Sequence, residues 1–355
     1  MALSYKLEEL LKTIKDYNAS DLHLNVDSEP QLRIDGILSP LTLPKLTKED
    51  TINLCYSILT QKQKATLKEE LELDFSFEIA NVARFRANYY YERECLAAVF
   101  RIIPKKPLSL DELKAPLIFK ELIKKEKGLI LVTGPTGSGK STTLAAMINE
   151  INEMYYKHIL TIEDPIEFIH QHKKSLISQR EVGRDTKSFL KALRSALRED
   201  PDVILIGEMR DKETIEAAIT AAETGHLVLG TLHTNSAIQT ISRIINVFPA
   251  NEQTQIRTQL SMTLNAIIAQ VLIPKIRGGR IAAYEIMINN SAIANLIREN
   301  KIAQIYSQMQ LNQNLTKMQT MNQVLAEYVK KRLITKEAAM AYTTKPGGLR
   351  KMIGL

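Results

Sequence analysis

With 355 residues, the chain is long for a single domain, so two domains are expected. Although 45% of the residues are hydrophobic, no apolar run approaches the roughly 20 residues that cross a bilayer and the start lacks the apolar stretch of a signal peptide, so we expect a cytoplasmic protein. Two cysteines exclude a four-cysteine zinc site, and the lysines behind the net charge of +7 are scattered in short clusters typical of a solvated surface, so no nucleic-acid partner is expected.

The N-terminal part, residues 1–103, predicts a small α+β domain. Apolar residues at helical spacing predict a helix over 3–16, and a period of two over 21–26 and 31–36 indicates two strands. A Thr-x-x-Asp capping box beginning at Thr47 predicts a further helix. Three more strands are expected, at 73–79, 82–91 and 96–103. Together they predict a mostly antiparallel sheet.

Residues 104–115 are predicted to form an interdomain linker. The run Pro104-Lys105-Lys106-Pro107 places two prolines within four residues, which disfavours both a strand and a helix interior. A short and stiff connection is therefore expected here.

The second domain, expected over 116–342, has an alternating pattern of strands and helices. Four apolar strands are predicted, at 129–133, 158–162, 203–207 and 227–232. This α/β pattern predicts a parallel sheet with a nucleotide at the C-terminal ends of its strands. After residue 235 the chain is predicted to be helical apart from a strand over 280–288, and the tail at 343–355 is expected to be loose.

A glycine-rich loop between a predicted strand and a predicted helix is the most specific motif. Its glycines let the backbone curl with its N–H groups inward around a polyphosphate, and the start of the helix adds positive potential. Lys140 is expected to reach the β- and γ-phosphates of ATP, and the Ser141 hydroxyl to ligate Mg²⁺. The predicted phosphate-binding residues are Gly134, Pro135, Thr136, Gly137, Ser138, Gly139, Lys140, Ser141 and Thr142.

Two strand ends carry the predicted catalytic carboxylates. Glu208 follows the buried strand at 203–207, in the arrangement of a Walker B motif, and is the predicted catalytic base. Glu163 follows the strand at 158–162. Because the C-terminal ends of parallel strands meet at one edge, Glu163 is a candidate for contact with water or Mg²⁺. The alternative for both carboxylates is a solvated strand end or a helix cap.

His226 and His233 bracket the predicted strand at 227–232. Their odd separation places them on opposite faces of an ideal strand, so they cannot both ligate one metal from it. A γ-phosphate sensor or a subunit contact suits at least one of them better, although a structural role is common for a lone histidine.

Arg84, Arg86 and Arg101 lie on predicted strands of the first domain, with no acidic run beside them to neutralise all three. Arginines brought to a nucleotide from a neighbouring domain or subunit stabilise transition-state charge. The alternative is that they cover an exposed face of the sheet.

Taken together, these motifs resemble the secretion-ATPase superfamily, and within it the retraction ATPases of type IV pili. The resemblance covers nearly the whole chain through the segments 19–24, 84–88, 99–104, the Asp box at 161–168, the Walker B run at 197–211 and the His box at 224–235. It implies a PAS-like N-terminal domain, a RecA-like P-loop ATPase domain and a homohexameric ring with ATP between the domains. It also implies that the three arginines face phosphates and that both histidines are functional.

Retraction motors of this superfamily carry the box Ala-Ile-Arg-Asn-Leu-Ile-Arg-Glu-Gly-Lys, and residues 292–301 match it at eight of the ten positions. Ala294 stands in place of an arginine and Asn300 in place of the glycine. The box is attributed to retraction rather than to ATP hydrolysis, so the departure leaves the ATPase prediction intact. Extension and secretion motors usually carry an extra N-terminal domain and a four-cysteine insertion, and we expect neither in this protein.

We therefore expect a cytoplasmic hexameric ATPase, associated peripherally with the inner membrane, that drives type IV pilus retraction. It would pull on an inner-membrane platform protein and meet pilin only indirectly, with ATP hydrolysis driving domain rotation about the 104–115 linker. A pilus-extension or type II secretion motor, or an accessory retraction ATPase, is the alternative within this class. A nucleic-acid-dependent RecA-like translocase and a nucleotide-gated scaffold are the alternatives from other classes.

Overall fold

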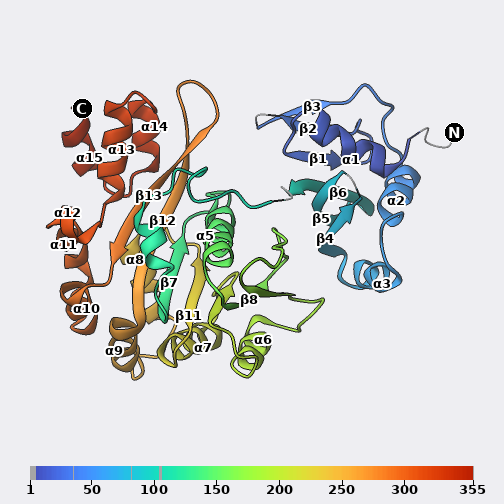
Figure 1. The fold of residues 1–355 in the computed structure, drawn as a ribbon. Helices are drawn as coiled ribbons and strands as arrows, with labels where there is room; N and C mark the ends of the chain where they lie inside the picture. The colour runs from blue at the N-terminus through green and yellow to red at the C-terminus, as the bar shows by residue number, and fades with distance from the viewer. Residues whose placement is uncertain (1–4, 35, 81, 104–105, 355) are drawn as a thin grey trace. The chain divides into compact units, whose positions relative to one another are not determined.

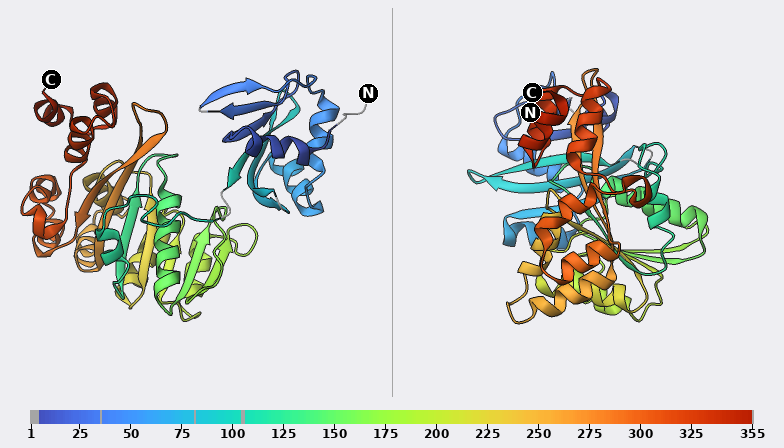
Figure 2. Two further views of the ribbon diagram at one scale, coloured as in Figure 1. Left: turned by 45° about the horizontal axis from the view of Figure 1, so that its top comes forward. Right: turned by 90° about the vertical axis from the view of Figure 1, so that its left-hand side faces the viewer.

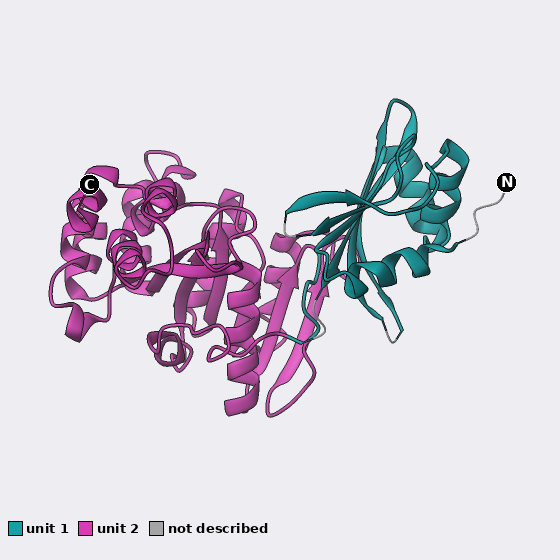
Figure 3. Ribbon diagram, turned by 90° about the horizontal axis from the view of Figure 1, so that it is seen from above, with its two compact units in different colours: residues 1–106, 165–169 teal, residues 107–164, 170–355 magenta. Residues whose placement is uncertain are grey.

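The computed structural model describes residues 5–34, 36–80, 82–103 and 106–354. Some predicted positions lie outside the described residues: Leu3 and Ser4 of the first helix, Asp35 of the second strand, Pro104 and Lys105 of the linker, and Leu355 of the tail. Two compact units make up the chain, residues 1–106 with 165–169 (unit 1) and residues 107–164 with 170–355 (unit 2) (Figure 3). None of the described helices is long and apolar enough to cross a membrane.

Unit 1 is built on a six-stranded sheet in the order β3-β2-β1-β6-β5-β4, in which every neighbouring pair is antiparallel. Its elements are α1 (Leu7–Asp16), β1 (Asp21–Leu24), β2 (Gln31–Ile34), β3 (Ile37–Pro40), α2 (Lys48–Tyr56), α3 (Gln61–Glu70), β4 (Glu72–Ile79), β5 (Ala83–Glu92) and β6 (Cys95–Ile103). Phe85, Tyr89 and Phe100 are fully buried between the sheet and the helices. The predicted antiparallel α+β architecture is confirmed.

Unit 2 contains a seven-stranded sheet in the order β13-β12-β7-β11-β10-β8-β9 (Figure 1). Its strands are β7 (Gly128–Thr133), β8 (His158–Glu163), β9 (Leu176–Glu181), β10 (Val203–Ile206), β11 (Leu227–Leu232), β12 (Leu264–Pro274) and β13 (Arg280–Ile288). All neighbouring pairs are parallel except β12 with β13. The predicted α/β fold with a parallel sheet is confirmed.

Helices cover both faces of the seven-stranded sheet. The helices between residues 118 and 316 are α4 (Ile118–Leu122), α5 (Lys140–Met154), α6 (Phe189–Ala196), α7 (Lys212–Glu223), α8 (Ala237–Asn246), α9 (Gln253–Thr263), α10 (Ser291–Arg298), the 3-10 helix η1 (Ile302–Gln304), α11 (Ile305–Met309) and α12 (Gln313–Thr316). Alternate residues of β7 serve the two layers, since Ile130 packs in the core with α4 and α5, whereas Leu131 packs in the core with α6 to α11. The sheet is therefore buried on both faces, and it can hold the side chains at its strand ends in fixed positions.

The C-terminal region differs from its prediction in two places. Residues 264–274, expected to be helical, form β12, because an apolar run buried on both faces cannot be distinguished from a buried helix by periodicity alone. The expected loose tail instead contains α15 (Pro346–Ile353), which begins with a proline, a residue that suits the first turn of a helix. Leu349 of α15 is fully buried in a core with residues of α13 (Met321–Lys330), α14 (Lys336–Tyr342), β12 and β13. Figure 2 shows these C-terminal helices, in red, gathered at the end of the chain.

Other elements were missed because few of their residues are buried, so they carry no regular apolar pattern. β3, α3 and β9 were not predicted. In the expected linker, Leu110 is buried with α4, so residues 107–115 are anchored to unit 2 rather than extended in solvent.

Candidate active site

The glycine-rich loop joins β7 to α5 at the C-terminal edge of the parallel sheet. Gly134 N donates to Leu232 O of β11 at 3.3 Å, which ties the start of the loop to the neighbouring strand. At the other end, Gly139 caps α5 with a φ of 87°, in the left-handed region that glycine adopts without strain. The first N–H groups of α5 have no partners within the helix, as phosphate binding at a helix start requires.

The Lys140 side chain folds back over this loop. Its Nζ donates to Gly134 O at 2.9 Å and to Pro135 O at 3.1 Å. The loop tip, Pro135 to Gly137, is exposed, as is Ser141 on the first turn of α5. The loop thus presents an ammonium group and a hydroxyl from adjacent residues, which is the set that binds phosphate oxygens and their magnesium ion in nucleotide sites.

The backbone around Glu208 is held by the strands on both sides of β10. Gly207 N donates to Ile162 O of β8 at 2.8 Å, and Met209 N donates to Thr231 O of β11 at 3.0 Å. The Thr231 hydroxyl also donates to the carbonyl of Gly207. These bonds fix the direction in which the Glu208 side chain leaves the sheet.

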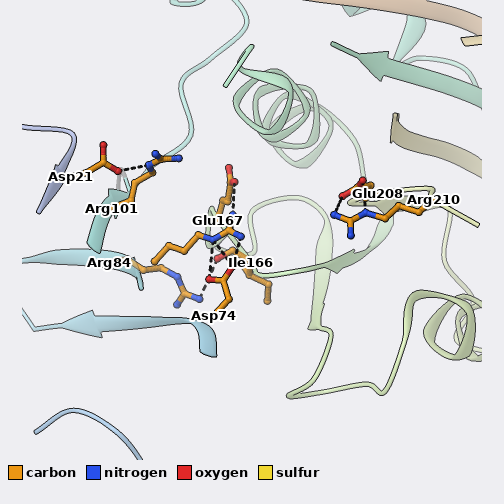
Figure 4. Close-up of polar contacts among 9 residues, drawn as sticks. Asp21, Asp74, Arg84, Arg101, Ile166, Glu167, Glu208 and Arg210 are labelled. Atoms are coloured by element: carbon orange, nitrogen blue, oxygen red, sulfur yellow. Dashed lines mark hydrogen bonds and ion pairs between the residues drawn. The ribbon is translucent and has the colours of Figure 1, made fainter. Parts of the chain in front are cut away.

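Glu208 forms a two-point ion pair with Arg210 (Figure 4). Arg210 Nε lies 2.5 Å from one carboxylate oxygen, and the terminal nitrogen donates to the other at 2.7 Å. His233 Nε2 lies 3.3 Å from the first of these oxygens. Partial burial alone would raise the pKa of Glu208, but the hydrogen bond and charge of Arg210, with the charges of His233 and Lys140, lower its pKa overall. Glu208 is therefore held as a carboxylate, the form that accepts a proton.

A pocket of about 190 Å³ opens beside this ion pair, lined by Asp164, Phe189, Glu208, Arg210 and Asp211. Asp211 accepts a hydrogen bond from Thr214 N at 2.8 Å and so caps α7, which makes its position part of the helix start. The pocket therefore has a rigid wall at α7 and a charged wall at Glu208.

Glu163 lies at the end of β8, the strand next to β10. Its Oε1 accepts hydrogen bonds from Thr161 Oγ1 at 2.7 Å and from Gln179 Nε2 at 3.2 Å. Ile162 and Ile206 are paired in register, so both carboxylates follow neighbouring strand ends. The structure places Glu163 and Glu208 at the same edge of the sheet.

The two histidines lie at opposite ends of β11. His233 follows β11 at the edge of the sheet that carries the glycine-rich loop (residues 134–142, the P-loop). There its side chain contacts Glu208. His226 precedes the strand, where its carbonyl accepts from Gly128 N at 3.0 Å and its Nδ1 donates to Ala221 O at 3.0 Å. The structure therefore brings His233, but not His226, to Glu208.

Arg84, Arg86 and Arg101 have acceptors within unit 1, and Figure 4 shows those of Arg84 and Arg101. Arg84 donates to Ser76 Oγ at 2.5 Å and to the carbonyl of Ile166 at 3.4 Å. Arg86 forms a two-point pair with Asp74, and Arg101 Nε lies 2.8 Å from the buried carboxylate of Asp21. Both acids come from neighbouring antiparallel strands.

Sequence reasoning missed Arg210, Asp74 and Asp21 as partners of the candidate site residues. Arg210 lies two residues beyond Glu208, so this spacing was a usable signal, whereas Asp21 and Asp74 meet their arginines only through strand register. Among the described residues, no group of three or more His, Cys, Asp or Glu side chains is arranged to hold a metal ion.

Comparison with known proteins gives consistent relatives over nearly the full length. The family of type II/IV secretion system proteins matches residues 2–278. The type IV pilus retractation ATPase PilT of Pseudomonas aeruginosa is 54% identical over 333 residues, covering 94% of this chain and 96% of that protein. The type IV pilus ATPase PilU of the same organism is 40% identical over 351 residues, covering 99% of this chain and 92% of that protein. A crystal structure of the pilus retraction motor PilT with bound ADP has a TM-score of 0.91 and 53% identity, covering 98% of this chain and 100% of that one.

Proposed function

The chain belongs to the family of type II/IV secretion system proteins, and from this premise we propose that it is an ATP-hydrolysing motor that retracts type IV pili. The observation that carries the proposal is the 54% identity to PilT over nearly the whole of both chains, well above the 40% identity to PilU. Identity spread over both units, rather than confined to the P-loop, supports a shared function as well as a shared fold.

We infer that the edge of the seven-stranded sheet binds ATP. Lys140 bonds loop carbonyls at a point from which its ammonium can turn to phosphate oxygens. Magnesium in nucleotide sites takes few protein ligands and several from phosphate and water, so the exposed Ser141 hydroxyl suits it. An ion held by Ser141 would supply positive charge beside the phosphates.

Glu208 is proposed as the catalytic base, because its neighbours keep it ionised and it lines the pocket at this edge. We assign Glu163 to the positioning of water or metal, and His233 to sensing of the γ-phosphate through its contact with Glu208. His226 is proposed for a subunit contact, since it lies at the other end of β11. Arg84, Arg86 and Arg101 are proposed to stabilise phosphate charge.

The assembly proposed for this motor is a homohexamer that acts in the cytoplasm. It would associate peripherally with the inner membrane by binding a platform protein of the pilus machine, and pilin would respond only indirectly. No nucleic acid is part of this proposal, and ATPase activity that single-stranded DNA leaves unchanged would agree with it.

Deletion of the gene in its own host tests the function directly. We expect cells with excess surface pili that do not retract, because assembly would continue without disassembly. Cells without pili would instead assign the chain to extension or secretion. Pili that still retract with reduced force would assign it to an accessory role alongside a sister motor, the alternative to which the departure at Ala294 points.

A further inference from the structure

A buried glutamine on β12 links the P-loop to α5, the helix that follows it. Gln270 is 3% exposed, and both functions of its side-chain amide are used. Its Nε2 donates to the carbonyl of Ser138 in the loop at 2.7 Å, and its Oε1 accepts from the hydroxyl of Thr143 on α5 at 2.7 Å. One side chain therefore links the loop to the first turns of the helix that follows it.

The register of the sheet puts Gln270 at this point. Ala269 pairs with Thr133, the last residue of β7, so Gln270 lies one position further along, beside Gly134. A Cβ added to Gly134 would lie 2.2 Å from the backbone oxygen of Gln270, and one added to Gly139 would lie 2.9 Å from its Nε2. The loop is thus packed directly on this residue, with no room for a side chain at either glycine.

The bond to Ser138 orients a peptide group of the loop. In a planar trans peptide, the carbonyl of Ser138 and the N–H of Gly139 point in opposite directions. Because the carbonyl is directed at Gln270 on β12, the N–H of Gly139 is directed away from β12. A P-loop binds phosphate through N–H groups held in this way, and a peptide free to flip would present its carbonyl oxygen to the anion instead.

The carbonyl of Ser138 decides which way round the amide lies. A carbonyl can only accept, so the NH₂ group of Gln270 faces Ser138 and Oε1 accepts from the hydroxyl of Thr143. Thr143 is fully buried as well, so its bond to Gln270 is shielded from competing water.

We propose that Gln270 is a positioning residue that presets the P-loop for a nucleoside polyphosphate, so that binding does not have to order the loop. The inference rests on the proposed function, in that it takes the loop to bind ATP. It concerns affinity rather than the chemical step, because Gln270 bonds the outer side of the loop and not the reacting atoms.

Two variants test the role. Gln270→Leu removes the donor and leaves the Ser138 carbonyl without it, so we expect the Kd for ADP and the KM for ATP to rise about tenfold to hundredfold, with kcat within about threefold of wild type. Gln270→Glu keeps the shape and the acceptor but donates only when protonated. The ratio of its ADP Kd to that of wild type should therefore grow as the pH rises from 6 to 9, whereas the ratio for Gln270→Leu should stay constant.

The measurements are calorimetric titration with ADP, steady-state ATPase kinetics and thermal unfolding, with Gln310→Glu on the exposed surface as the matched control. If Gln270→Leu and Gln270→Glu lower Tm while the Kd and KM stay within about twofold of wild type at every pH, Gln270 is only a packing residue and the inference is wrong. Failure of the wild-type protein itself to bind ADP would overturn the proposed function instead.

Discussion

The two sheets of this molecule carry their charged groups in different ways. In unit 2, Glu163, Glu208 and His233 follow the ends of neighbouring parallel strands, so the order of the strands brings them to one edge. In unit 1, Arg86 and Arg101 lie within antiparallel strands and meet acids on the adjacent strands. The parallel sheet of unit 2 gathers two carboxylates and an imidazole at one edge. The antiparallel sheet of unit 1 instead places Arg–Asp ion pairs along its strands. Chemistry is therefore expected to depend on the unit 2 edge most strongly.

The largest effect is expected at Glu208. Replacement by glutamine keeps the size but removes the proton acceptor, so turnover should fall about 10²- to 10⁴-fold while ATP binding is retained. Glu163→Gln is the matched variant from the neighbouring strand end, and its loss should be smaller. Phosphate release and ADP titration measure the two effects, and wild-type turnover in Glu208→Gln would remove the assignment of the base.

Lys140→Ala tests the P-loop, which lies at the same edge of the sheet as Glu208. Loss of the ammonium should weaken nucleotide binding by about 2 to 5 kcal/mol, or roughly 30-fold to several thousand-fold in Kd, because a charged hydrogen-bonding partner of the phosphates is gone. Calorimetric titration with ADP measures it. Binding within threefold of wild type would show that the loop does not hold the phosphates as proposed.

In unit 1, Arg86 and its partner Asp74 separate a role in catalysis from a role in stability. The pair is about one-third exposed, so breaking it should change the free energy of unfolding by less than about 1 kcal/mol. If Arg86 stabilises phosphate charge, Arg86→Ala should lower kcat about tenfold to hundredfold, while Asp74→Asn leaves it within about threefold. Equal losses in the two variants would mean that the ion pair, rather than the arginine, matters.

The smallest expected effect is a shift in pH dependence at Arg210. Its charge and hydrogen bond lower the pKa of Glu208, so Arg210→Ala should raise that pKa. A base with a raised pKa is protonated at higher pH, and the acidic limb of the kcat/KM profile should move upward relative to wild type. An unmoved limb would show that another group sets it.

The same difference between the two sheets explains which parts of the fold and of the site can be predicted from the sequence. The strands that precede the P-loop, Glu208 and His233 are mostly apolar and fully buried, and each has a motif at its end, so the local pattern was sufficient to predict both the strands and their common edge. The parallel sheet then follows from the alternation of strands and helices.

Contacts that depend on the register between paired strands could not be predicted from the sequence. Asp21 meets Arg101 across 80 residues, and Gln270 meets Ser138 across 132, with no local signal for either contact. β12, which carries Gln270, was itself predicted to be helical. Arg210 differs, because it lies beside Glu208 in the sequence; there the pattern was visible, but the pairing required the geometry of the turn after β10.

The measurement closest to the central claim is retraction of pili by cells whose only copy of the gene encodes Glu208→Gln. Fluorescent labelling of pili in these cells, beside cells with the wild-type gene, reports extension and retraction separately. We predict a full level of the variant protein, excess pili and no retraction, because nucleotide would bind but not be hydrolysed. Normal retraction by the variant would contradict the claim that hydrolysis at this edge drives the motor.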